Sequence, residues 1–194
     1  MKPGTLRPLV HAGLVGFALL GPVLGKWGMA GVAFGAFLFN LLVLPRTPIG
    51  RTLRREGEPR WNGLVAYPLA VALAYALFHP PFAAISWAVM ALGDPVAAVV
   101  GAGRKGGWRI PWNRRKSVAG STAFLVAAWI GATGILCALG HIDGWKGGVP
   151  AFLVLGGGAA LVGALAESLP VPGDDNLPVV LATGAALTLA IPVF

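Results

Sequence analysis

Charged residues are scarce in this chain of 194 amino acids. They make up 11% of the sequence, whereas hydrophobic residues make up 56%. Soluble globular domains normally carry about 25% charged residues. This scarcity excludes an ordinary soluble domain, and we predict an all-α polytopic integral membrane protein.

Long polar stretches and a disulfide framework are also missing. The single cysteine, Cys137, lies inside an apolar run and has no partner in the chain. The longest expected connections are 45–63 and 103–117, so we expect one transmembrane domain over 1–194 and no separate soluble domain. Runs long enough to cross roughly 30 Å of hydrocarbon occupy seven segments, 8–25, 27–44, 64–79, 82–102, 118–139, 149–169 and 177–194.

Acidic residues number only seven, against 15 Lys and Arg, for a net charge of +8. Of the Lys and Arg residues, only Lys26 and Lys146 lie on the side opposite the N-terminus in the expected topology. By the positive-inside rule, the N-terminus and the loops 45–63 and 103–117 are predicted to face the cytoplasm in a prokaryotic-type membrane. Topology and contact with anionic lipid explain much of this basicity, and we expect no nucleic-acid partner.

Asp94 lies inside the expected span 82–102. An ionised carboxylate at the bilayer centre costs about 2.5–3.5 kcal/mol on insertion scales. Asp is a good N-cap and Pro suits the first helical position, so Gly93-Asp94-Pro95 predicts a break in the span. We expect Asp94 at the floor of a polar cleft open to the cytoplasm. The alternative is a structural Asp that pairs with an Arg or caps a kink.

A second acidic cluster lies in "ALAESLPVPGDDN", where prolines and a glycine predict a tight turn. Glu167 lies at the end of the sixth expected span, with Asp174 and Asp175 across the turn. Carboxylates beside a basic loop are typical of a Mg²⁺ site, and the predicted metal ligands are Asp94, Glu167, Asp174 and Asp175. For the last two, a solvated turn that caps the seventh span is the alternative.

The loop 103–117 is rich in glycine and basic residues. Gly101, Gly103 and Gly106 fit GxGxxG, but neither a preceding strand nor the downstream acid of a dinucleotide fold is present, and there is no Walker A spacing. Glycine backbone N–H groups and basic side chains both bind phosphate. Ser117 can cap the next span, where the helix dipole favours an anion. The alternative to phosphate binding is that the basic residues of this loop only set the orientation of the chain in the membrane, by the positive-inside rule. The basic residues are Arg104, Lys105, Arg114, Arg115 and Lys116.

Together these patterns favour phosphoryl or nucleotidyl transfer onto a lipid, because both reactions need a metal and cations around a polyphosphate. The stretch "ALGDPVAAVVGAGRKGGWRIPWNRRKSVAGSTAF", followed by "ESLPVPGDDNLPVVLATG", resembles the CTP-dependent polyprenol kinase family of phytol kinase, dolichol kinase and CTP-dependent diacylglycerol kinases. The family is related to the phosphatidate cytidylyltransferases. The match covers roughly 60–190 and contains two motif blocks in the family's order.

The resemblance implies transfer of the γ-phosphate of CTP to a membrane lipid alcohol with Mg²⁺ or another divalent cation. It implies Asp94, Lys116 and Glu167 as catalytic residues, with Asp94 acting as metal ligand or base. It implies phosphate or nucleotide binding by Gly101, Gly103, Arg104, Arg114, Arg115, Lys116, Ser117 and Asn176. More weakly, it implicates Arg7, His11, Glu56, Gly63 and Tyr67. Pro95 departs from the family, many members of which carry a small hydroxyl residue there.

The sequence leaves two other functions open. A CTP:phosphatidate cytidylyltransferase would use the same metal and nucleotide but release pyrophosphate. A small ion-coupled transporter would also place acids inside spans, but it has no need of a basic glycine-rich loop on one side. The sequence does not identify the acceptor alcohol, and a homo-oligomer is neither predicted nor excluded.

Overall fold

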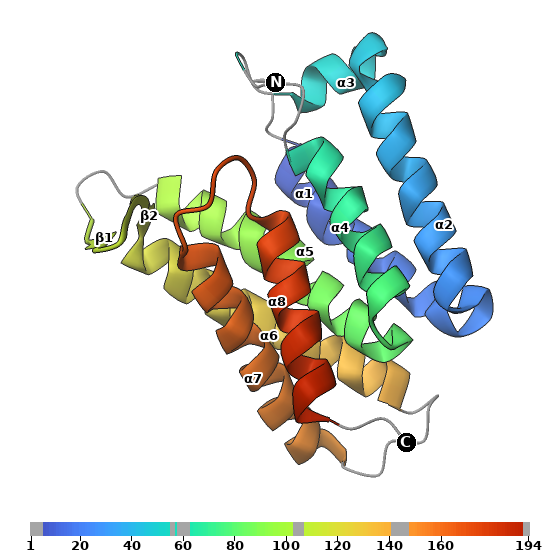
Figure 1. Ribbon diagram of the computed structural model, residues 1–194. Coiled ribbons are helices and arrows are strands. Elements are labelled where there is room, and N and C mark those ends of the chain that lie inside the picture. Colours follow the sequence, from blue (N-terminus) through green and yellow to red (C-terminus); the bar gives the residue numbers. More distant parts are fainter. Residues whose placement is uncertain (1–5, 55–56, 58–62, 103–106, 141–147, 192–194) are drawn as a thin grey trace.

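The computed structural model describes residues 6–54, 57, 63–102, 107–140 and 148–191. This part of the chain is almost entirely helical, which confirms the predicted all-α class (Figure 1). The elements in chain order are α1 Arg7–Leu14, the 3-10 helix η1 Val15–Leu20, α2 Gly21–Leu42, the 3-10 helix η2 Leu44–Arg46, α3 Pro48–Leu53, α4 Gly63–Leu77, α5 Pro80–Ala102, β1 Arg109–Ile110, β2 Asn113–Ser117, α6 Val118–Gly140, α7 Gly148–Ser168 and α8 Asn176–Ala190.

Helices occupy each of the seven expected spans. Within the described chain, four stretches are long and apolar enough to cross a membrane: Arg7–Arg46, Pro80–Ala102, Val118–Gly140 and Gly148–Ser168. α4 and α8 have 15 residues each, so they extend about 22 Å, less than the roughly 30 Å of hydrocarbon. Both pack against α5. The chain is a polytopic integral membrane protein.

The stretch Arg7–Arg46 is not one straight span. Gly25 has φ 65° and ψ 179° inside α2, a left-handed conformation that glycine adopts readily. Figure 1 shows the chain reversing here, so that α1 and η1 run one way and α2 returns. This reversal falls between the expected spans 8–25 and 27–44, and part of the first of them is a 3-10 helix.

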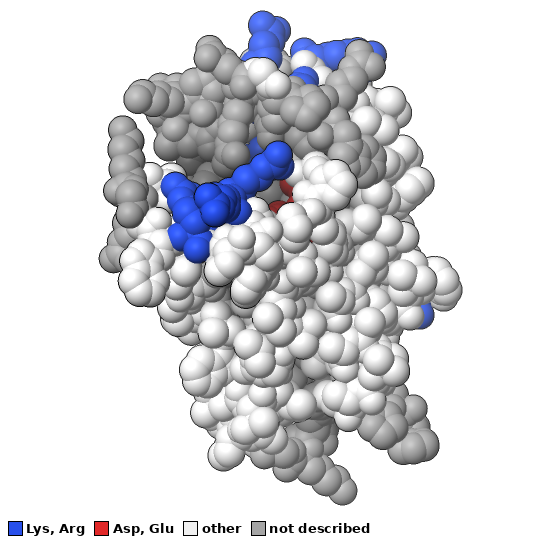
Figure 2. All heavy atoms as spheres, turned by 60° about the vertical axis from the view of Figure 1, so that its left-hand side comes forward, with Lys and Arg blue, Asp and Glu red and all other residues white. Residues whose placement is uncertain are grey.

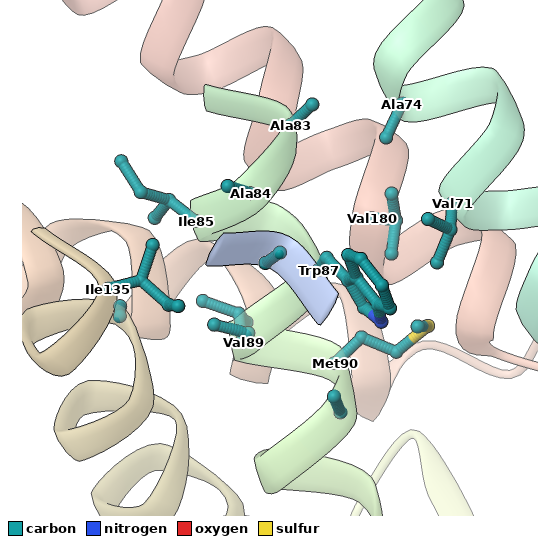
Figure 3. Packing of buried hydrophobic residues seen from close by; sticks show 14 of the residues in the cluster. Val71, Ala74, Ala83, Ala84, Ile85, Trp87, Val89, Met90, Ile135 and Val180 are labelled. Carbon is teal, nitrogen blue, oxygen red and sulfur yellow. The ribbon is translucent and has the colours of Figure 1, made fainter. Parts of the chain in front are cut away.

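α5 is the central helix of the bundle and packs against α1, α4, α6, α7 and α8. In Figure 3, Ile85 and Val89 of α5 point toward Ile135 of α6, while Met90 lies toward Val71 of α4. Many of its other positions are wholly buried alanines. Small residues let membrane helices approach closely, so α5 is held by contacts along most of its length.

The predicted break at Gly93-Asp94-Pro95 is wrong, because α5 continues through all three residues to Ala102. Pro95 removes one backbone hydrogen bond, but prolines are tolerated in membrane helices whose neighbours re-satisfy the freed groups. Gly93 lies directly against the ring of Phe124 on α6, and this close packing supports the helix on either side of the proline. Asp94 is therefore a helical residue, not an N-cap.

Candidate functional site

A polar cavity of about 480 Å³ opens between α1, α5, the start of α6 and the turn between α7 and α8. Figure 2 shows Lys and Arg side chains gathered beside a hollow in which acidic atoms are visible. Most predicted site residues that the structure describes line this polar cavity. They are Arg7, His11, Asp94, Gly101, Arg115, Lys116, Ser117, Glu167, Asp174 and Asp175.

A β-ribbon carries Lys116 to the cavity. β1 and β2 pair antiparallel, and the buried Asn113 donates from Nδ2 to the carbonyl oxygens of Ser168 (3.2 Å) and Leu169 (3.1 Å). Trp112 Nε1 also donates to Ser168 Oγ at 3.2 Å. These bonds fasten the ribbon to the end of α7, next to Glu167, so the basic strand and the acidic helix end are placed together.

Lys116 bridges two acids. Its Nζ donates to Glu167 Oε1 at 2.6 Å and also to Asp175 Oδ2. The other oxygen of Glu167, Oε2, accepts from Ser121 Oγ at 3.0 Å. Burial alone would lower the pKa of Lys116, but Asp175 and Glu167 outweigh it and raise that pKa above its ordinary value. The ammonium group is therefore charged and held by α7 and the acidic turn.

Asp94 faces the same cavity from α5. Asp175, Lys116, Asp174 and Arg7 lie near enough to act on its carboxylate electrostatically. Among the described residues, however, none forms a hydrogen bond or ion pair with that carboxylate. Asp94 therefore lines the cavity without such a partner in the described part of the chain.

The turn between α7 and α8 places the remaining acids. Gly173 has φ 86°, which favours glycine, and brings the chain back into α8. Asp174 Oδ1 accepts from the backbone N–H of Asn176 at 3.0 Å. Burial raises the pKa of Asp174, while this hydrogen bond opposes the rise. Asp175 does not cap α8 with its side chain, because its carboxylate is engaged by Lys116.

Gly63 begins α4 between two charged groups of the site. A methyl group there would overlap the Arg7 guanidinium and lie 2.6 Å from Asp174 Oδ2. Arg7 itself is buried, at 9% exposure. The absence of a side chain at Gly63 therefore lets α1 and the acidic turn approach each other.

For the phosphoryl transfer that the sequence predicts, we expect Gly63→Ala to lower the rate by about 10²-fold, since small displacements of binding groups can cost that much. Gly13→Ala on α1 is the matched control, because no atom lies within 4 Å of its added methyl group. The measurement is the initial rate of that predicted reaction. Equal rates for the two variants would contradict a role for this close approach.

The structure places the other predicted residues differently. Ser117 caps α6 as predicted, with Oγ accepting from Gly120 N at 3.1 Å. Arg114 is exposed and lines a neighbouring cavity beside the turn. Asn176 is buried next to the turn and does not line the polar cavity, and Tyr67 lines a separate apolar cavity. Glu56, Gly103 and Arg104 lie outside the described residues.

Sequence reasoning missed three residues of this region: Arg109, Ser121 and Asn113. Arg109 lines the polar cavity from β1, and its basic character was a usable signal. Ser121 follows Ser117 by four residues, so the two share one face of α6. Asn113 carries no such signal, because its partners lie 55 and 56 positions away.

The carboxylates of the cavity are of the kind that a divalent cation such as Mg²⁺ prefers. In the described part of the chain, no three His, Cys, Asp or Glu side chains form a metal centre by themselves. Mg²⁺ commonly takes one or two carboxylates and completes its shell with phosphate oxygens and water. With Glu167 and Asp175 engaged by Lys116, Asp94 and Asp174 are the carboxylates best suited to that role.

No family model matches the chain, and no solved structure matches it. Curated relatives do. Phytol kinase of Synechocystis sp. is 33% identical over 187 residues, which cover 93% of this chain and 76% of that protein. Probable phytol kinase 1, chloroplastic, of Glycine max is 35% identical over 145 residues, covering 70% of this chain and 46% of that protein.

Farnesol kinase, chloroplastic, of Arabidopsis thaliana is 29% identical over 202 residues, covering 93% of this chain and 64% of that protein. The chain thus spans about half to two thirds of the length of these plant relatives. The match to the cyanobacterial protein extends over most of both chains. The chain belongs to the polyprenol kinase family, which includes the phytol and farnesol kinases.

Proposed function

We propose that this chain is a membrane-embedded kinase that transfers the γ-phosphate of CTP to an isoprenoid alcohol. One observation supports this most strongly. The polar cavity combines four basic and four acidic side chains at one end of an apolar helical bundle. Basic groups suit a polyphosphate and carboxylates suit its metal ion, while the surrounding helices give a lipid access. The four basic side chains are Arg7, Arg109, Arg115 and Lys116, and the four acidic ones are Asp94, Glu167, Asp174 and Asp175.

In the proposed reaction the alcohol oxygen attacks the γ-phosphorus of CTP. A new O–P bond forms, the bond to the β,γ-bridging oxygen breaks, and CDP leaves. The alcohol proton must pass to a base. Asp94 is suited to accept it, because its carboxylate faces the cavity without a protein partner among the described residues.

Besides the buried Arg7, the cations of the cavity divide into two groups. Lys116 is fixed by Glu167 and Asp175, so its charge is preorganised where negative charge develops. Arg109 and Arg115 are exposed on the ribbon at the mouth of the cavity, where we assign them to the outer phosphates. When bound beside Asp94 and Asp174, Mg²⁺ would supply charge neutralisation of the transferring phosphate.

We also propose that the polar cavity faces the cytoplasm, because it opens on the side that carries the basic ribbon. Arg114→Cys in a Cys137→Ser background places one thiol on this exposed ribbon. A membrane-impermeant maleimide should label it in inverted vesicles and not in intact cells. Labelling in intact cells alone would reverse the proposed orientation.

The proposed function is tested with protein in nanodiscs, Mg²⁺, and CTP labelled at either the γ- or the α-phosphate. The acceptors are phytol, farnesol, a longer polyprenol, diacylglycerol and phosphatidate. Label that enters lipid only from γ-labelled CTP supports the kinase. Label from α-labelled CTP would identify a cytidylyltransferase instead. Transfer from ATP or GTP but not CTP would contradict the proposed donor.

A further inference from the structure

A second cavity, of about 330 Å³, lies between α1, η1, α2, α4 and α5 and adjoins the polar cavity at His11. We call it the apolar cavity. The polar side chains in its wall are already engaged: Asn40 Nδ2 donates to Leu64 O at 2.7 Å, and Tyr67 Oη donates to His11 O at 2.9 Å. Most of the lining is aliphatic or aromatic and includes Leu14, Phe17, Leu20, Met29, Val71 and Trp87.

The helix packing explains why this space exists. α1 packs against α5, whereas α2 packs mainly against α4, so the two arms that meet near Gly25 have different main neighbours. Along α2 the lining includes Ala33 and Ala36, whose small side chains leave room. From His11 to Leu20 the apolar cavity follows α1 and η1 for roughly 16 Å, about half of the roughly 30 Å of hydrocarbon.

His11 lines both cavities. It is 3% exposed, and its ring lies 4.4 Å from that of Tyr67, centroid to centroid. Trp87 Nε1 donates to Tyr67 Oη at 2.7 Å, so the wall at this junction is built from α1, α4 and α5. A molecule that passes His11 moves from the charged site into an apolar space.

We propose that the apolar cavity holds the tail of a single-chain isoprenoid alcohol, whose hydroxyl reaches the polar cavity beside His11. This inference rests on the proposed function, which requires one polar reacting atom attached to a long apolar chain. Such a molecule is accommodated where a charged site and an apolar cavity meet, because each end then keeps its preferred surroundings.

The volume favours one short tail over two acyl chains. At about 330 Å³ the apolar cavity lies near the lower end of the roughly 300–1,000 Å³ typical of ligand pockets. Another apolar hollow lies between α5 and α6, around Val96, Trp108 and Ile130. Its described lining shares no residue with the polar cavity, so a tail there would not lead its hydroxyl to Asp94.

Ala36 lines the apolar cavity at an exposed position of α2, and Ala36→Phe tests the inference by narrowing the cavity. We expect the KM for phytol to rise about tenfold or more, while the KM for prenol, which has one isoprene unit, changes little. Gly35→Phe is the matched control, because Gly35 is exposed with no atom within 4 Å of its added Cβ and does not line the cavity. An equal effect on phytol and prenol, or the same effect from Gly35→Phe, overturns the inference.

A binding measurement separates this inference from the proposed function. A phytol analogue with a diazirine on its tail is photolysed with the wild-type protein, and labelled peptides are mapped by mass spectrometry. Label on α1, η1, α2 and α4, reduced in Ala36→Phe, supports the inference even if no phosphate is transferred. Label confined to the α5–α6 hollow, or unchanged in Ala36→Phe, overturns it even if the kinase reaction occurs.

Discussion

Asp94→Asn lowers transfer of phosphate to lipid by about 10²–10⁴-fold, the range expected when a positioned proton acceptor is lost. The carboxamide has nearly the same shape as the carboxylate, so packing around α5 is preserved. It accepts no proton and binds a divalent cation weakly. The measurement is the initial rate of lipid phosphorylation at saturating CTP, with the same protein checked by thermal unfolding.

Ser86→Ala is the control on the same helix. Ser86 is fully buried, and its Oγ donates to Ala83 O at 3.0 Å, away from the polar cavity. We expect it to keep the wild-type rate. If Asp94→Asn also kept that rate, Asp94 would be a structural residue. Its assignment as the proton acceptor and metal ligand would then be wrong.

Lys116→Met is expected to reduce both transfer and stability. Transfer falls by about 10²-fold or more, because a preorganised cation near the phosphates is lost. Stability falls because Glu167, 2% exposed, and Asp175 lose their cation. Breaking a fully buried ion pair costs about 3–5 kcal/mol, and we expect a smaller loss here because the Lys116 side chain is 25% exposed. The readouts are the transfer rate and the midpoint of unfolding in detergent.

The double variant Lys116→Met with Glu167→Gln separates these two effects. Glutamine is neutral and can still accept from Ser121, so much of the lost stability should return while transfer stays low. If the double variant recovered transfer together with stability, Lys116 would serve only to neutralise Glu167. A wild-type rate in Lys116→Met alone would contradict its assignment to phosphate binding.

The general architecture could be predicted because it depends on the hydrophobicity of long segments, not on single contacts between residues. Helices lie in all seven predicted apolar runs, although α4 and α8 are shorter than a full span, and the turn at Gly25 falls where the first two runs meet. The acids and bases assigned to one face include Asp94, Lys116 and Glu167, which the structure brings to one cavity. Orientation in the membrane stays a prediction.

The details that failed or were missed depend on contacts between distant positions. Local preferences of Asp94 and Pro95 predicted a helix break, but packing of α5 against its neighbours overrides them. Lys116 finds its partners 51 and 59 residues away. No pattern within the loop 103–117 indicates that Lys116 binds two acids outside the loop. Nor does any pattern there indicate that Asn113 anchors the ribbon to α7.

The proposed transfer of phosphate from CTP to a lipid alcohol is tested most directly by the product balance of a single reaction. The reaction contains wild-type protein, Mg²⁺, CTP and phytol. CDP and lipid monophosphate are quantified together by mass spectrometry. We expect equal amounts of the two products, with both lost in Asp94→Asn. CDP released without phosphorylated lipid, or a CDP-lipid formed with pyrophosphate, would contradict it.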